Sequence, residues 1–86
     1  MKIGDSVRVS NAYKIANENI KHGDIGKIVS YKETKRLGEK ITIVGVEFDR
    51  NINGHTCNGV GKKGCCAWIT KKRLVPIGNN SKSYKG

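Results

Sequence analysis

The sequence predicts an all-β fold, a small barrel of about five strands. Short segments in which apolar and polar residues alternate are separated by turns rich in glycine, asparagine and aspartate. The strongest segment changes the phase of its alternation next to a glycine, as a strand does where a small barrel turns a corner. A chain of 86 residues has enough apolar surface for one core. We therefore expect one domain over residues 1–77 and a flexible basic tail over residues 78–86.

The alternating segments define the expected strands. In the first, Val7 and Val9 face one side, and serine and arginine side chains face the other. In the second, Gly26 marks a position where another part of the backbone comes close or the strand bulges. The third and strongest changes phase beside Gly45, which predicts a bulge or a sharp bend there. In the last, Pro76 is tolerated only at an edge or an end. The strands are expected at residues 3–10, 25–31, 41–48, 65–70 and 74–77.

The connections between these strands differ in character. Residues 11–21 place Ile20 and other apolar side chains near helical spacing, so we expect a long loop with one helical turn that covers an end of the core. Residues 32–40 carry charges of both signs and are expected to be the exposed turn of a hairpin. Thr70 is expected to cap one helical turn at residues 71–73, before the last strand.

The longest expected connection follows the third strand and has roughly sixteen residues, against about two to five in a common hairpin loop. Four potential soft metal ligands lie in it or directly after it: His55, Cys57, Cys65 and Cys66. The set contains no C-x-x-C pair, and adjacent cysteines on a strand point in different directions. We therefore expect no metal, no cofactor and a loop held by ordinary packing. A structural zinc ion and a disulfide from Cys57 to Cys65 or Cys66 remain the alternatives.

The sequence contains no complete catalytic motif. A Cys/His pair needs a third group that orients the base, and the spacing of His55 and Cys57 provides none. The glycine-rich residues 59–64 depart from the P-loop pattern, because Lys63 stands where serine or threonine is required and a strand follows instead of a helix. We therefore expect a binding module and not an enzyme.

Positive charge is concentrated in the second part of the chain. Residues 1–49 hold nine Lys/Arg and all seven acidic residues, which gives +2, whereas residues 50–86 hold eight Lys/Arg and no acidic residue, which gives +8 of the total of +10. Such a field attracts polyanions and acidic protein surfaces. The plainer interpretation is a solubilising surface neutralised by counter-ions.

These charges, with an aromatic ring on which a base could stack, predict a nucleic-acid interface in the second half. Its expected residues are Arg50, Lys62, Lys63, Trp68, Lys71, Lys72 and Arg73. Tyr31 and Tyr84 are further stacking candidates, and Trp68 is alternatively a core residue. The expected partner is DNA or RNA, and the alternatives are an acidic host protein bound by an adaptor or inhibitor, or a zinc-stapled scaffold. Because neither a secretory signal nor a membrane-spanning run is recognisable, we expect a cytoplasmic protein that does not contact a membrane. We also expect a monomer.

Both halves of the chain resemble known families. The first half resembles the KOW-type, SH3-like barrels of ribosomal proteins and transcription elongation factors in the patterns Gly4-Asp5-x-Val7-x-Val9 and Gly23-x-x-Gly26-x-Ile28. The second half resembles small SH3-like proteins of bacteriophages and prophages in Val46-Glu47-Phe48-Asp49, Gly54-His55-Thr56-Cys57, Gly64-Cys65-Cys66-Ala67-Trp68 and Leu74. The resemblances imply an SH3-like barrel and an accessory protein of a phage or other mobile element. Neither family has a single activity that could be carried over to particular residues.

Overall fold

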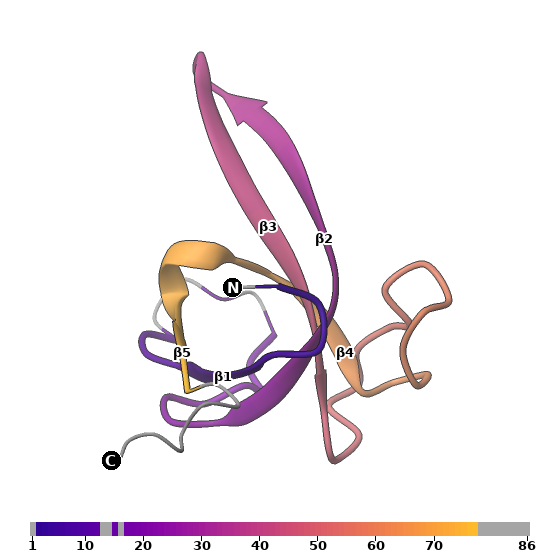
Figure 1. Ribbon diagram of the computed structural model, residues 1–86. Coiled ribbons are helices and arrows are strands. Elements are labelled where there is room, and N and C mark those ends of the chain that lie inside the picture. The colour runs from indigo at the N-terminus through magenta and orange to yellow at the C-terminus, as the bar shows by residue number, and fades with distance from the viewer. Residues whose placement is uncertain (1, 13–14, 16, 78–86) are drawn as a thin grey trace.

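One curled antiparallel sheet of five strands forms the body of the protein in the computed structural model, which describes residues 2–12, 15 and 17–77 (Figure 1). The strands stand in the order β4-β3-β2-β1-β5, so β4 and β5 are its edges. A single 3-10 turn, η1, joins these two edges, and this short link requires the sheet to curl. The elements are β1 (Ser6–Val9), β2 (Ile25–Arg36), β3 (Glu39–Phe48), β4 (Cys66–Thr70), η1 (Lys71–Arg73) and β5 (Leu74–Pro76).

The prediction of an all-β fold with five strands and a short helical turn before the last is confirmed. The sheet stays open, however, because among the described residues no ladder joins β4 to β5. Thr70 stands at the N-cap of η1 but its side chain makes no capping hydrogen bond, so the predicted cap is wrong. No helix in the described part of the chain has the length and apolar character needed to cross a bilayer. The expected tail, residues 78–86, lies outside the described residues.

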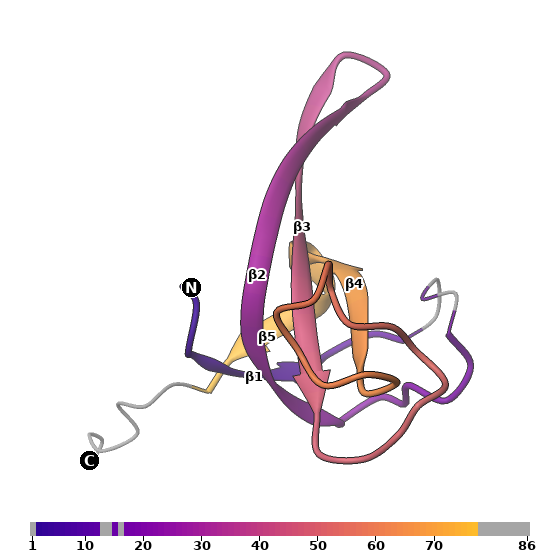
Figure 2. The ribbon, with the colours of Figure 1, turned by 90° about the vertical axis from the view of Figure 1, so that its right-hand side faces the viewer.

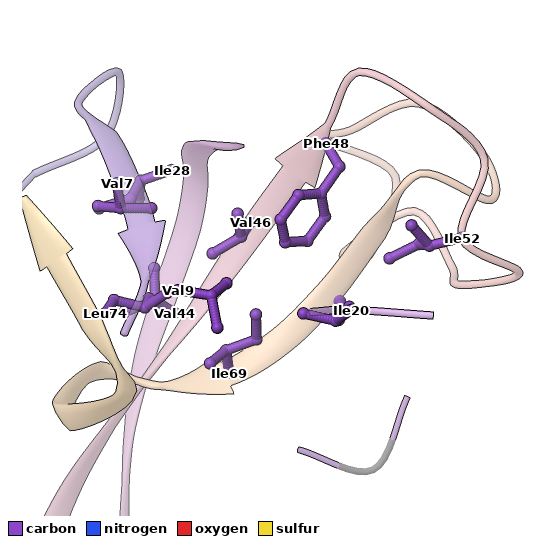
Figure 3. Close-up of a cluster of buried hydrophobic side chains, with 11 residues drawn as sticks. Val7, Val9, Ile20, Ile28, Val44, Val46, Phe48, Ile52, Ile69 and Leu74 are labelled. Atoms are coloured by element: carbon purple, nitrogen blue, oxygen red, sulfur yellow. The ribbon is translucent and has the colours of Figure 1, made fainter. Parts of the chain in front are cut away.

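The core lies on the concave face of the sheet, which we call the core face (Figure 3). Alternate residues of each strand point into it, as the period of two in a strand requires. Two connections add to the core: Ile20 comes from the segment before β2, which confirms its predicted covering role, and Ile52 comes from the connection between β3 and β4. The main members of the cluster are Val7, Val9, Ile20, Ile28, Val44, Val46, Phe48, Ile52, Ile69 and Leu74.

The alternation of β3 is regular, and the predicted bulge in this strand is wrong. Ile41, Ile43 and Gly45 lie on the opposite side, the outer face, so the apparent change of phase arises because β3 is apolar on both faces. The irregularity lies in β2 instead, where the register shifts between Ile28 and Ser30, and Ser30 then pairs with Gly45. A bulge adds one residue to one strand and increases its twist. The bend that the sheet needs therefore lies in β2, and not in β3, where it was predicted.

Gly26 confirms the predicted close approach of the backbone. A methyl group at this position would lie 2.5 Å from Cγ1 of Val46 and 2.9 Å from the carbonyl oxygen of Glu47. Both atoms belong to β3, which pairs with β2 at this point. A larger residue would thus push the two central strands of the sheet apart.

Strands β2 and β3 continue beyond the rest of the sheet as a two-stranded arm, residues 30–42 (Figure 1, Figure 2). The ladder of β1 stops at Lys27 and that of β4 stops at Ile43, whereas β2 and β3 pair with each other until Arg36 faces Glu39. The prediction that residues 32–40 form the exposed tip of a hairpin is confirmed, but the turn itself consists of residues 37 and 38 alone, and the other residues continue the two strands. Both faces of the arm meet solvent, so its charged side chains show no alternation from which strands could be predicted.

Replacing Ile52 by alanine tests whether the connection between β3 and β4 belongs to the core. We expect the substitution to lower the free energy of unfolding by about 2–5 kcal/mol, because it leaves a cavity. Ile52 is 1% exposed, whereas Val60 in the same connection is 58% exposed, so Val60→Ala is the matched control. It should change stability by less than about 0.5 kcal/mol in urea unfolding curves. Equal effects of the two substitutions would contradict the assignment.

Candidate functional site

Trp68 lies on the outer face of the sheet and not in the core. It pairs with Gly45 in the ladder between β4 and β3, and it is half-buried. The imidazole of His55 stacks beside it, with ring centroids 6.2 Å apart and ring planes 25° apart. The Nζ atom of Lys32, from the base of the arm, lies 4.6 Å from the centre of the indole ring. The indole ring of Trp68 is thus already in contact with a cation, Lys32, and with a second ring, that of His55.

The connection between β3 and β4, residues 49–65, is called the long loop and wraps around the edge of β4 (Figure 2). Ile52 enters the core face, while Cys57 lies on the outer face above Gly45. Main-chain hydrogen bonds attach the loop to the strand, with His55 N to Cys66 O at 2.9 Å and Cys66 N to His55 O at 3.2 Å. The loop is therefore a fixed part of the fold, held from both sides of the sheet.

Two buried thiols fill the space between the long loop and the outer face. A methyl group at Gly45 would lie 2.8 Å from Sγ of Cys57, and one at Gly61 would overlap Sγ of Cys66, so both glycines make room for sulfur. Burial, followed by the neighbouring Cys66 thiol, raises the pKa of Cys57 to about 12. Burial also raises the pKa of Cys66. Both groups are therefore neutral near pH 7 and act as small apolar side chains.

The cysteine and histidine residues are not arranged as a metal site. All three cysteines are free and buried. The Nδ1 atom of His55 accepts a hydrogen bond from the backbone N–H of Cys57 at 3.0 Å. Within the described part of the chain, no group of three or more His, Cys, Asp or Glu side chains could hold a metal ion. What these residues do in the structure is anchor the long loop.

Arg50 is exposed, but its guanidinium is bound to other groups of the protein. Its guanidinium donates to Oδ2 of Asp24 at 2.7 Å and to the carbonyl oxygen of Asn19 at 2.8 Å, and it lies 5.8 Å from the ring centre of Phe48. Burial alone would raise the pKa of Asp24, but hydrogen bonds from the Lys21 backbone and from Arg50 outweigh it and lower the pKa. This ion pair connects the start of the long loop to the turn before β2.

A groove of about 650 Å³ lies between the arm and η1. We call it the arm groove. Lys40 of β3 lines its arm side, and Lys71 and Lys72 of η1 line the other side. A smaller hollow of about 230 Å³ lies on the same side of the arm and is lined in part by Tyr31, Glu33 and Lys71. The remaining lining residues of the arm groove are Glu39, Ile41, Thr42, Thr70, Leu74 and Pro76.

The residues of the expected interface lie in separate parts of the structure. The long loop precedes β4 and η1 follows it, so the two basic segments lie at opposite ends of this strand. Lys62 and Lys63 are exposed on the long loop, whereas Lys71 and Lys72 face the arm groove. Arg73 is half-buried, and its carbonyl oxygen accepts hydrogen bonds from the N–H and the hydroxyl of Ser10 at 2.8 and 3.0 Å. The charges therefore do not form the single patch that their positions along the chain suggested.

Sequence reasoning missed Lys32 and Lys40, which were assigned to a solvated turn. Lys40 lines the arm groove, and Lys32 lies over Trp68 on the other side of the sheet. The one available signal was Gly38, since a glycine, which adopts positive φ without strain, is typical of a tight hairpin turn. Tyr31, named as a stacking candidate, is 51% exposed beside Lys71. Tyr84 lies outside the described residues.

Comparison of the chain with known proteins adds no further information about this site. The chain matches no model of a protein family, no curated protein and no solved structure.

Burial of the thiols predicts that they react slowly with alkylating reagents. At pH 8 we expect Cys57 and Cys66 to react with an alkylating reagent at least about tenfold more slowly in the folded protein than in guanidinium, because the thiolate is the nucleophile and burial suppresses it at both residues. The measurement is mass spectrometry after timed exposure to iodoacetamide. Rapid modification of Cys57 in the folded protein would contradict its raised pKa and its burial.

Proposed function

We propose that the protein is a non-enzymatic module that binds nucleic acid in the arm groove. The observation that carries this proposal is the presence of lysines on both sides of the groove, Lys40 on β3 and Lys71 and Lys72 on η1. Phosphates of a strand lying there would meet an ammonium group on either side. Release of counter-ions from such contacts supplies most of the sequence-independent affinity for nucleic acid. The total charge of +10 adds long-range attraction for a polyanion.

Two acidic residues beside the lysines do not cancel this attraction. Oε1 of Glu33 lies 3.8 Å from Nζ of Lys40, in a pair whose side chains are both more than half exposed. Exposed pairs of this kind contribute about 0–1 kcal/mol, so a phosphate can replace the carboxylate at small cost. Glu39 pairs in register with Arg36 on the neighbouring strand, which places a compensating charge beside it.

Tyr31 offers an aromatic surface next to one of these lysines, Lys71. Its side chain is 51% exposed and lines the hollow that also contains Lys71. A ring in this position can pack against a sugar or an unpaired base, and stacking on a base contributes about 1–3 kcal/mol. The aromatic and basic groups would therefore act on the same segment of a bound strand, which supports nucleic acid over a smooth acidic surface.

We also propose that the protein is related to SH3-like barrels. The link between β4 and β5 by one 3-10 turn supports a relationship to SH3-like barrels, whose final strands are joined in this way. On this proposal the protein is a cytoplasmic monomer and an accessory protein of a phage or other mobile element. An acidic host protein is the competing partner, because it would be attracted by the same lysines.

Two double variants with the same loss of charge test the position of the interface. We expect K71Q/K72Q to weaken binding about tenfold at low salt and to reduce the slope of log affinity against log salt by about two. K62Q/K63Q, on the long loop, should weaken binding by less than about threefold, because it changes only the long-range field. The measurement is fluorescence anisotropy with short duplex DNA, single-stranded DNA and RNA, from about 50 to 200 mM salt.

The results that contradict the proposal are equally specific. Equal losses in both double variants would mean that binding follows total charge and not the arm groove. Absence of binding to all three nucleic acids at the low-salt end would remove the nucleic-acid function altogether. A stoichiometric complex with a protein from nuclease-treated lysate, lost in K71Q/K72Q, would then assign the groove to an acidic protein.

A further inference from the structure

The tip of the arm presents an apolar side chain on a backbone of unusual conformation. Arg36 and Glu39 pair in register, so the turn between β2 and β3 consists of Leu37 and Gly38 alone. Both residues have positive φ, 55° and 84°, as a type I′ turn requires. The side chain of Leu37 is 98% exposed, more than that of any other large hydrophobic residue in the described part of the chain.

Folding gives no reason for a leucine at this position. The first residue of such a turn is usually asparagine, aspartate or glycine, which adopt the left-handed conformation more easily than a bulky side chain does. The backbone of Leu37 is strained, and its side chain is almost fully exposed, so burial does not compensate for the strain. Backbone strain of this kind is concentrated at binding and catalytic sites. The structure therefore indicates that Leu37 contacts a partner.

The rest of the arm fits a grooved polyanion. Beyond Ile43 the arm is a ribbon of two strands, and every side chain of residues 31–40 is exposed. A two-stranded ribbon of this kind fits into a groove of duplex DNA. Cations on both faces of the ribbon would approach the phosphates on either side of the groove. The arm carries four basic residues, Lys32, Lys35, Arg36 and Lys40, against two acidic residues, Glu33 and Glu39.

We propose that Leu37 is a wedge that enters between two base pairs from the minor groove of duplex DNA and bends the duplex. One apolar side chain is enough for this role, because a wedge has to unstack only one base step. A stable protein partner would instead need about 800 Å² on each side. A single leucine also buries too little apolar area to hold a protein on a bilayer. The proposal rests on the proposed function, because the arm groove would hold the phosphates that lie next to the wedge.

Substitutions at the tip separate folding from binding. Leu37→Asn and Leu37→Gly both suit the turn, so neither should lower the melting temperature. We expect each to weaken binding to a duplex of about 25 base pairs about tenfold. Wild-type protein should bring fluorophores on the two ends of this duplex closer together, and both variants should lose this bending signal. Val60→Asn, at another exposed apolar position on the long loop, is the matched control and should behave as the wild type.

The outcomes distinguish this proposal from the function on which it rests. If K71Q/K72Q weakens duplex binding while Leu37→Asn and Leu37→Gly leave affinity and bending unchanged, the wedge is wrong and the arm groove stands. If wild-type protein binds no duplex in a salt-dependent manner, the proposed function fails first. Binding to phosphatidylserine vesicles that depends on Leu37, without an effect of Leu37 on duplex binding, would also overturn the wedge and assign the tip to lipid.

Discussion

The pairing of β2 with β3 is the interaction on which the rest of the structure depends. Its first half lies within the body, where Ile28 faces Val46 over the core. Its second half extends beyond the ladders of β1 and β4 and forms the arm. The same ladder therefore supports both the core and the exposed arm. The bulge between Ile28 and Ser30 lies near the boundary between the body and the arm. A change that weakens the central pair of strands is expected to affect stability and binding together.

The sheet separates two kinds of surface. On the outer face, Cys57 and Cys66 are buried between the long loop and the sheet, and His55 and Lys32 contact the ring of Trp68. Glycines on the strand and on the loop make this close packing possible, so the conspicuous cysteine and glycine residues serve the fold. On the side of η1, lysines line an open groove that no part of the described chain fills. The arm groove, although less conspicuous in the sequence, is therefore the surface that we propose as the binding site.

The sequence predicted the elements that have a buried face and failed where both faces meet solvent. Alternation identified β1 and the body of β3, because burial of Val7, Val9, Val44 and Val46 imposes a period of two. The arm has no such constraint, and its charged residues were taken for a turn. The predicted interface contained Lys71 and Lys72 but also the distant Lys62 and Lys63, because proximity along the chain does not reveal that β4 separates them. Lys40 could be found only once its strand was known to line the groove.

Mapping the contact surface by NMR tests the central claim most directly, namely that the arm and η1 together bind nucleic acid. Titration of the labelled protein with a short DNA duplex should shift the amide signals of residues 35–42 and 70–73, which border the groove and the tip. Signals of residues 55–63 on the long loop should stay in place apart from small uniform changes. Shifts confined to the long loop and Trp68 would contradict the account and move the interface to the outer face.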